Sequence, residues 1–241
     1  MPRPSPKKAS KRPPPVDHAA AKPRTSRPSL PLTRERIAQA ALQLIDAHGL
    51  ADFSTRKLGA ELGCEAMAFY NHFPGKEAIL DAVVERMVAK VAVPPREAGT
   101  WVERARMFAR SFRALARIHP RAFPLIPTRR FNAPGTLAML ESVYATFLGE
   151  GLDPLAAVKV YRTLGNFLAG TALNEIAVAE FAAAAPTTDP AATTLSSLAT
   201  VAPYLAPAYF DEVFEFGLEV VLTGCQHLVV QDNERNRPGA R

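Results

Sequence analysis

Apolar residues recur every three or four positions along most of the chain after residue 31, the spacing that places them on one face of an α-helix. In the first such segment the recurring residues are Ile37, Ala41, Leu44 and Ile45. The same spacing predicts longer helices over about 76–91, 100–118, 134–150, 153–184 and 207–230. Residues 186–203 are rich in Thr, Ser and Pro and predict a loop with at most a short helix. No segment alternates apolar and polar residues as a strand does, so the pattern predicts an all-α protein.

Two shorter helices are expected between the first helix and the one that begins near residue 76. Ser54 can cap a helix that Gly63 ends, and another helix covers about 65–72 before Pro74-Gly75 breaks the chain. Two short helices joined by a glycine turn can cross steeply, which leaves the second free to enter the major groove of DNA. The segment therefore predicts a helix-turn-helix, although many helical hairpins share its spacing.

Charge divides the chain at residue 31. The whole sequence has 29 Lys and Arg against 23 Asp and Glu, a net charge of +6. Residues 1–31 alone hold eight basic residues, one acidic residue and nine of the 22 prolines, a composition typical of a disordered, extended tail. The remaining residues carry a net charge of −1. Net charge by itself therefore does not identify the folded part as a DNA-binding protein.

Several classes of protein are disfavoured by what the sequence lacks. No run of about 18 apolar residues predicts a membrane span, and the N-terminus lacks the apolar centre of a secretory signal, so a cytoplasmic protein is expected. Cys64 and Cys225 are isolated, and the five histidines form no metal-binding spacing. Motifs for a nucleophilic serine, a phosphate-binding loop or a dinucleotide are missing. We expect no metal, no cofactor and no enzymatic activity.

Three short stretches between Leu32 and Val91 carry a family resemblance. They read AALQLIDAHG, STRKLGAELG and FYNHFPGKEAIL, and with them the segment resembles the N-terminal DNA-binding domain of TetR-family regulators. Further along, SFRALARIHPRAF, GNFLAGTALNE and FEFGLEVVLTG are similar to the C-terminal domain of the tetracycline-repressor class. The resemblance covers about residues 32–230 and leaves out the tail.

The resemblance implies a domain organisation and a function. A three-helix, helix-turn-helix DNA-binding domain over 32–91 would be linked by its fourth helix to a helical ligand-binding and dimerisation domain over 92–241, with 1–31 as a basic, Pro-rich tail. The expected protein is a ligand-responsive transcriptional regulator. It would be a repressor that binds a palindromic operator in double-stranded DNA as a homodimer and is released by a small, largely apolar effector.

DNA contacts are carried over from the family motif. Arg56 matches an arginine that reaches guanine through its guanidinium group, although an ion pair with Glu61 or Glu65 is an alternative. Polar residues common on the recognition helix are replaced here by small or apolar ones, which offer only apolar contacts such as those with a thymine methyl group. The implied DNA-binding residues are Thr55, Arg56, Ala66, Met67, Ala68, Tyr70, His72 and Lys76. Thr55, Tyr70 and Lys76 would hold phosphates, whereas His72 would contact a phosphate or stabilise its own turn.

Bulk charge does not favour DNA binding by residues 32–91, which contain seven Lys or Arg and eight Asp or Glu. We hypothesise that the basic tail supplies the positive charge that residues 32–91 lack, by lying along the minor groove or the backbone of the DNA. The alternative is a solvated tail that only keeps the protein soluble. Deleting residues 1–30 and measuring how DNA affinity falls with salt separates the two.

The last two long helices are the expected dimer surface. In the family they pair with their copies in a four-helix interface, and Gly217 and Gly224, seven residues apart, would permit close approach. The alternative is that these faces form the core of one chain. On the 100–118 helix, four arginines at helical spacing are interpreted as a solvated face: Arg106, Arg110, Arg113 and Arg117.

The effector is not expected to be a magnesium–tetracycline complex. Family members that bind this complex use histidines and a glutamate, and Ala92, Ile126 and Asn174 stand at those positions here. Methyl, branched aliphatic and amide groups do not supply the hard-cation chemistry. The predicted cavity is largely apolar, with ligand-binding residues Phe108, Phe112, Ile126, Arg130, Asn166, Phe167 and Asn174. The alternative for each aromatic residue is that it simply fills the core.

Two other functions compete with this interpretation. An all-α small-molecule-binding protein or enzyme with a vestigial helix-turn-helix would need a paired acid and base in its cavity, and none lie close together in sequence. A nucleoid-type protein would bind DNA without sequence preference through the tail. The sequence leaves open the operator, the effector, the direction of regulation and contact between tail and DNA.

Overall fold

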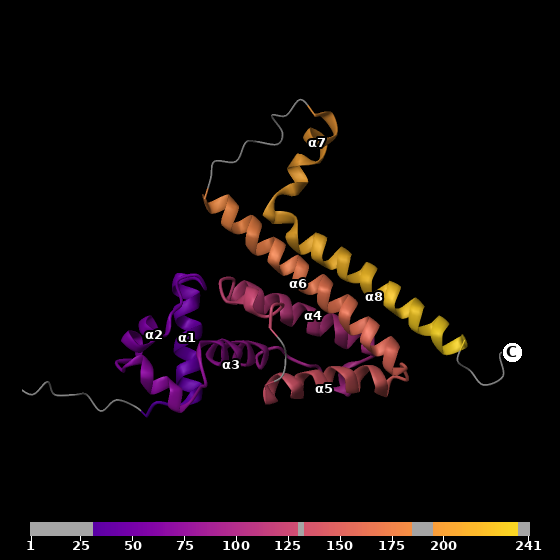
Figure 1. Ribbon diagram of the computed structural model, residues 1–241. Helices are drawn as coiled ribbons and strands as arrows, with labels where there is room; N and C mark the ends of the chain where they lie inside the picture. The colour runs from indigo at the N-terminus through magenta and orange to yellow at the C-terminus, as the bar shows by residue number, and fades with distance from the viewer. Residues whose placement is uncertain (1–30, 130–132, 185–194, 236–241) are drawn as a thin grey trace, which may run out of the picture. The chain divides into compact units, whose positions relative to one another are not determined.

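The computed structural model describes residues 31–129, 133–184 and 195–235, and every regular element in these ranges is helical (Figure 1). The all-α prediction is confirmed. The tail and Arg130 lie outside the described residues. In chain order the α-helices are α1 (Arg34–His48), α2 (Thr55–Leu62), α3 (Lys76–Val88), α4 (Trp101–Ile118), α5 (Pro134–Gly149), α6 (Pro154–Ala184), α7 (Ser196–Val201) and α8 (Phe210–Arg235). Short 3₁₀ helices lie at η1 (Ala66–Asn71), η2 (Arg96–Ala98), η3 (Phe123–Leu125), η5 (Ala202–Leu205) and η6 (Pro207–Tyr209).

Side-chain caps fix where the helices begin. Thr33 accepts a hydrogen bond from the amide of Arg36, and Ser54 accepts one from the amide of Lys57. Thr100 and Glu103 form a reciprocal capping box at the start of α4. A capping side chain typically contributes about 1 kcal/mol to helix stability. These caps explain why the helix starts expected near 33, 54 and 100 agree with the structure.

The turn between α2 and η1 depends on two glycines. Gly63 has a φ of +67°, in the left-handed region that favours glycine. At Gly59, a Cβ atom would lie 2.6 Å from the carbonyl oxygen of Cys64, too close for any other residue without a backbone shift. The chain therefore passes from α2 into η1 through a tight glycine turn, the connection that a helix-turn-helix uses.

The second helix of this motif differs from the predicted one. Residues expected as an α-helix over 65–72 form the 3₁₀ helix η1, with bonds from the Ala68 amide to the Glu65 carbonyl and from the His72 amide to the Phe69 carbonyl. Glu65 makes no side-chain capping bond. A short segment without a capping side chain can adopt the tighter i→i+3 pattern. Its hydrogen bonds then have poorer geometry than those of an α-helix, while the segment keeps its tertiary packing.

Two hydrophobic clusters share helix α4. The first joins α1, α2, η1 and α3 to the C-terminal half of α4 through Leu115 and Ala116. The second joins the N-terminal half of α4, including Trp101 and Ala105, to α5, α6 and α8. Phe108 and Phe112 pack against both clusters. Displacement of α4 therefore disturbs the packing of the helix-turn-helix and of the C-terminal helices together.

Candidate functional site

Several predicted DNA-binding side chains are exposed around the helix-turn-helix. On η1, Met67 and Tyr70 expose 70% and 53% of their surface. Arg56 on α2 and Lys76, the first residue of α3, are also exposed. Within the described residues no ion pair joins Arg56 to Glu61 or Glu65. The guanidinium group of Arg56 is therefore available to a ligand.

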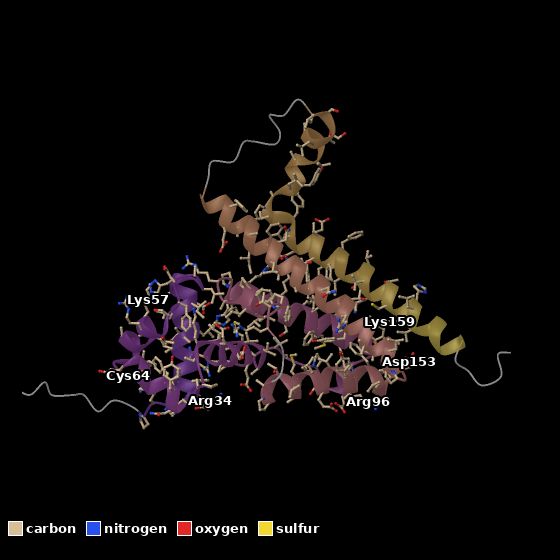
Figure 2. All side chains as sticks on the ribbon, in the orientation of Figure 1. Arg34, Lys57, Cys64, Arg96, Asp153 and Lys159 are labelled. Carbon is tan, nitrogen blue, oxygen red and sulfur yellow. The ribbon has the colours of Figure 1, made fainter. Side chains whose placement is uncertain are left out.

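The other four predicted DNA contacts are half-buried: Thr55, Ala66, Ala68 and His72. The carbonyl of His72 accepts a hydrogen bond from Arg34, whose guanidinium lies 4.1 Å from the centre of the Phe73 ring. This contact ties the end of η1 to the start of α1. Arg34, Lys57 and Cys64, labelled in Figure 2, lie at the start of α1, on α2 and in the turn.

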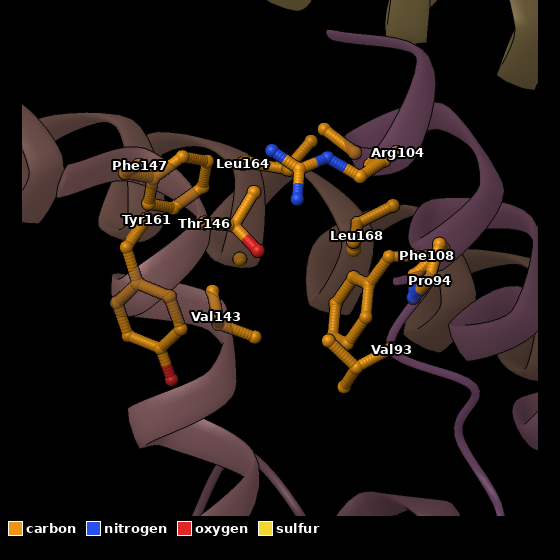
Figure 3. A pocket seen from close by; sticks show the side chains of 12 residues that line it. Val93, Pro94, Arg104, Phe108, Val143, Thr146, Phe147, Tyr161, Leu164 and Leu168 are labelled. Carbon is orange, nitrogen blue, oxygen red and sulfur yellow. The ribbon is translucent and has the colours of Figure 1, made fainter. Parts of the chain in front are cut away.

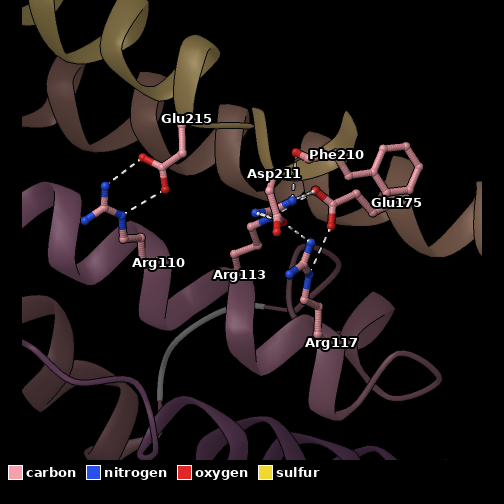
Figure 4. Close-up of polar contacts among 7 residues, drawn as sticks. All are labelled: Arg110, Arg113, Arg117, Glu175, Phe210, Asp211 and Glu215. Carbon is pink, nitrogen blue, oxygen red and sulfur yellow. Dashed lines mark hydrogen bonds and ion pairs between the residues drawn. The ribbon is translucent and has the colours of Figure 1, made fainter. Parts of the chain in front are cut away.

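The arginine stripe of α4 is only partly a solvated face, which corrects the interpretation from sequence: Arg110 and Arg117 are exposed, whereas Arg113 is buried. Its arginines pair with carboxylates on α6 and α8 (Figure 4). Two pairs are bidentate, with nitrogen–oxygen distances of 2.7–3.0 Å: Arg106 with Glu219, and Arg110 with Glu215. The sequence could not show this, because the partners lie 62 to 113 residues further along the chain.

The four arginines of α4 and their carboxylate partners on α6 and α8 form an ion-pair ladder. Arg113 is its buried member and is only 7% exposed. Its Nη2 atom lies 2.6 Å from the carboxylate of Glu175 on α6 and 2.8 Å from the carbonyl of Phe210. The guanidinium also lies 4.3 Å from the centre of the Phe214 ring. Arg117 completes the ladder with Asp211 at 2.5 Å. The ladder fixes α4 against the start of α8 and the middle of α6.

The acidic partners on α8 titrate below their ordinary range. Hydrogen bonds from Arg117, Arg110 and Arg106 lower the pKa values of Asp211, Glu215 and Glu219, respectively. A carboxylate with a lowered pKa in the folded state stabilises the fold above its unfolded pKa, near 4. That stabilisation is lost as the pH falls through the lower, folded pKa.

We therefore expect the free energy of unfolding to fall as the pH drops below about 4, and the fall to be modest because the three carboxylates are 40–72% exposed. The double variant Arg106→Gln/Arg110→Gln should show a shallower fall, since two of the lowered pKa values return toward normal. Urea unfolding from pH 7 to pH 3 measures both curves. Equal slopes for the two proteins would contradict this assignment of the ion pairs.

A second polar cluster joins the end of α4 to the helix-turn-helix. His119 is 8% exposed, and its Nδ1 atom lies 2.7 Å from the carboxylate of Asp46 near the end of α1. Its Nε2 atom lies 3.2 Å from Nζ of Lys90, which follows α3. Arg121 donates to the carbonyls of Asp46 and Ala47. These bonds couple the C-terminus of α4 directly to α1.

A small cavity of about 40 Å³ lies between α4, α5 and α6 (Figure 3). Its lining is mostly aliphatic and aromatic: Val93, Pro94, Arg104, Ala105, Phe108, Val143, Thr146, Phe147, Tyr161, Leu164, Gly165 and Leu168. Burial raises the pKa of the Tyr161 hydroxyl, so this group stays neutral. Sites for drug-sized ligands usually measure about 300–1,000 Å³. The cavity must widen to hold such a ligand.

Of the predicted ligand-binding residues, Phe108 lines this cavity. Phe112 stacks on Phe108 and contacts Phe123 in an edge-to-face arrangement. Ile126 is buried in the first cluster, and Phe167 stacks on Phe214 of α8. Asn166 and Asn174 are exposed on α6, and Arg130 lies outside the described residues. As ligand contacts all seven, Phe108 included, remain predictions.

One cavity residue, Arg104, was missed from the sequence. It lies three residues after Trp101 and four before Phe108, so helical spacing places it on the apolar face of α4. A cation at an apolar position was the available signal. Among the described residues, no group of three His, Cys, Asp or Glu side chains could hold a metal ion.

Helix α8 has one buried and one exposed apolar face. The exposed residues follow helical spacing, with exposed fractions of 59%, 72%, 56% and 62% for Val213, Phe216, Val220 and Leu228. By length and composition, Pro207–Val230 would also suit a membrane span, with 28% of its apolar stretch buried, but a single such helix among the described residues is weak evidence for one. An exposed apolar stripe beside ion-paired residues suits a protein interface better than a lipid bilayer.

The two glycines of α8 have different surroundings. A Cβ atom at Gly217 would lie 2.7 Å from the Phe167 ring of the same chain, so this glycine accommodates α6. At Gly224 a Cβ atom would meet nothing within 4 Å. The close approach expected at Gly217 therefore occurs inside one chain, and Gly224 alone has open space beside it.

The fold and these sites define a helix-turn-helix protein whose C-terminal helices enclose an apolar cavity. Two family models match the chain: the bacterial regulatory proteins of the tetR family over residues 37–83, and the tetracycline repressor-like C-terminal domain over 93–229. The chain belongs to the TetR family of transcriptional regulators.

Relatives match along most of their length. The chain is 31% identical over 214 residues to the class A tetracycline repressor from transposon 1721 of Escherichia coli, covering 84% of this chain and 95% of the relative. It is 28% identical to the repressor DrrR1 of Streptomyces coeruleorubidus, covering 88% and 83%. The Streptomyces coelicolor regulator ActR, solved with (S)-DNPA, has a TM-score of 0.68 and 26% identity, covering 83% of this chain and all of ActR.

These comparisons establish the function at the level of the family. The chain is a ligand-responsive, DNA-binding transcriptional regulator and not an enzyme. The competing interpretation as an enzyme with a vestigial helix-turn-helix is thereby excluded.

Proposed function

We propose that this regulator is a repressor that binds a palindromic operator as a homodimer in the bacterial cytoplasm and leaves it when a small, largely apolar effector binds. The observation that carries the proposal is the position of α4. This helix lines the cavity at one end and packs in the core of the helix-turn-helix at the other. We assign DNA binding to residues 32–91, and effector binding and dimerisation to 92–241.

Specific DNA recognition would rest on a few exposed side chains. Arg56 would donate to guanine, Met67 would offer an apolar contact, and Tyr70 and Lys76 would hold phosphates. The exposure of these four residues around one short motif supports the assignment. Since residues 32–91 have no excess of positive charge, the positions of a few cationic side chains, rather than bulk charge, must provide the affinity for DNA.

Homodimerisation would bury the exposed apolar stripe of α8. A helix-turn-helix monomer reads one half-site, and a two-fold axis through paired α8 helices would place a second reader on a palindrome. Gly224 supports close approach of a partner helix because it has open space beside it. The ladder to α4 would hold the dimer helix and the DNA-binding motif in one fixed relation.

Effector binding would act by widening the cavity. A drug-sized effector would push α4, α5 or α6 apart, since the cavity of about 40 Å³ is far smaller than the usual site for such a ligand. Displacement of α4 would shift its end at His119 and, through Asp46, the helix-turn-helix. The two states need differ by only about 1–3 kcal/mol in effector affinity to give the usual degree of allosteric coupling.

The cavity lining favours an organic effector that binds without a metal. Neither carboxylate nor imidazole groups occur among the described lining residues, so a magnesium chelate would find none of the charged oxygen or imidazole ligands that hold such a complex. ActR has been solved with (S)-DNPA and with actinorhodin. By analogy, we propose a polycyclic or aromatic organic effector for this regulator.

Selection of bound fragments from the protein's own genome tests this function and yields the operator. On that operator, Arg56→Gln should lower affinity about 10- to 100-fold, since one bidentate guanine contact is worth about 1–3 kcal/mol. The matched control is Lys57→Gln, which removes a neighbouring charge held 3.4 Å from Asp52 and should change affinity less than about threefold. Fluorescence anisotropy measures both.

Recovery of fragments without a shared palindrome would contradict the proposal and favour nonspecific binding. Equal losses for Arg56→Gln and Lys57→Gln would show that Arg56 acts only as a charge.

A further inference from the structure

Arg104 is a buried cation beside the apolar cavity. It is 4% exposed and borders both the cavity and the groove just outside it, which is lined by Arg96, Ser142 and Gly149. In Figure 3 its guanidinium group lies at the edge of the cavity, near Thr146. Its Nε atom is buried and has no hydrogen-bond partner. A buried donor without a partner destabilises the protein, so a ligand that supplies an acceptor there is favoured.

The charge around Arg104 is only partly balanced. Its Nη2 atom lies 2.9 Å from Oε1 of Glu150, whose side chain is 28% exposed at the rim. On the same rim, Arg96 donates to the carbonyl of Gly149 at 3.4 Å. The described lining of the cavity and groove contains both arginines and no Asp or Glu. Two cations and one nearby carboxylate leave a net positive charge at the mouth of the cavity.

The geometry points to an acidic-group subsite at Arg104, and we propose that the effector is an apolar acid. Its ring system would lie among Phe108, Val143 and Leu168, and its carboxylate, sulfonate or acidic phenolate would accept hydrogen bonds from Arg104. This inference rests on the proposed function, because it identifies the chemical class of the effector for the same cavity.

A purely structural role for Arg104 explains fewer of these observations than a ligand-binding role does. An ion pair with Glu150 needs only the terminal nitrogen and leaves Nε unpaired beside the cavity. An anionic oxygen at the mouth would satisfy Nε and add a charge-assisted bond, roughly twice as strong as a neutral one. Glu150, at the rim, would then compete with the bound acid for the same guanidinium group.

A pair of fluorescent probes tests the subsite on the full-length protein. The acid is 8-anilinonaphthalene-1-sulfonate, and its neutral counterpart is N-phenyl-1-naphthylamine, which has the same ring system without the sulfonate. Arg104→Met should weaken binding of the sulfonate at least about tenfold, because a hydrogen bond to a charged group is lost. Binding of the neutral probe should change less than about twofold.

The variant Glu150→Gln separates the subsite from a structural ion pair. It removes the competing carboxylate and keeps Arg104, so the sulfonate should bind about threefold or more tightly while the neutral probe is unaffected. The control Arg110→Gln changes an arginine of the same helix that faces α8 and should alter neither probe. A third variant, Gly165→Leu, adds a side chain where a Cβ atom meets nothing within 4 Å and should reduce binding of both probes.

Equal effects of Arg104→Met on both probes, or none on either, would overturn the subsite. Sulfonate binding that Gly165→Leu leaves unchanged would overturn it too, since the acid then binds elsewhere. Should Arg104→Met fail to fold, Glu150→Gln decides, and an unchanged ratio of the two affinities overturns the proposal. Operator binding by the unliganded protein does not depend on these probe affinities. A protein that binds no specific operator would therefore contradict the proposed function and leave the test of the subsite unaffected.

Discussion

Replacing Phe216 by glutamate should convert the protein to a monomer and lower its operator affinity by at least about 10³-fold, the usual gap between specific and nonspecific DNA binding. Phe216 is 72% exposed on the apolar stripe of α8, between Val213 and Val220. In a two-fold interface, one substitution places two carboxylates in the same apolar contact, where they repel each other and lose water.

The fold itself should survive this change, because the core contacts of α8 lie on its other face, at Phe214 and Leu218. A matched control is Leu137→Glu, which adds the same charge at a 50% exposed leucine on α5. Light scattering after size exclusion measures the mass, and anisotropy measures operator binding. A Phe216→Glu protein that stays dimeric and binds the operator normally would show that another surface pairs.

The second large effect is expected at Arg113. Arg113→Met should lower the free energy of unfolding by about 3–5 kcal/mol, the usual cost of leaving one member of a buried ion pair without its partner. The uncompensated group is Glu175, whose side chain is 10% exposed and keeps only Arg117 at 3.5 Å. Urea unfolding followed by circular dichroism measures the change.

The double variant Arg113→Met/Glu175→Gln should recover much of this loss, since no buried charge is then unpaired. The control Arg110→Met removes a pair whose arginine is 54% exposed, and it should cost about 1 kcal/mol or less. Similar losses for Arg113→Met and Arg110→Met would show that burial does not set the strength of this ladder.

The sequence predicted most of the fold because its helix boundaries are local. Thr33, Ser54 and Asp153 accept hydrogen bonds from amides two or three residues further on, so the signal and its effect are neighbours in the chain. The 3₁₀ form of η1 was not predictable in this way. Apolar spacing indicates that a helix forms there, whereas the i→i+3 bonding depends on how α2 and the turn present the segment.

The candidate site was less predictable because its contacts are distant in sequence. The exposure of Arg56 and Tyr70 followed from a local motif. By contrast, the partner of Arg113 lies 62 residues away and that of Arg110 lies 105 away. The cavity likewise combines side chains from α4, α5 and α6, and spacing along any one helix does not indicate which aromatic residue borders a void.

If an effector acts by widening the small cavity, as proposed, the size of this cavity sets how much effector the cell must accumulate before transcription responds. If the widened form is a minor population, the apparent dissociation constant equals the intrinsic one divided by the fraction that is widened. Each tenfold decrease in that fraction raises the required concentration tenfold. Substitutions that change the packing of Val143 or Leu164 would thus shift the midpoint of the dose–response curve without altering any atom that reads DNA.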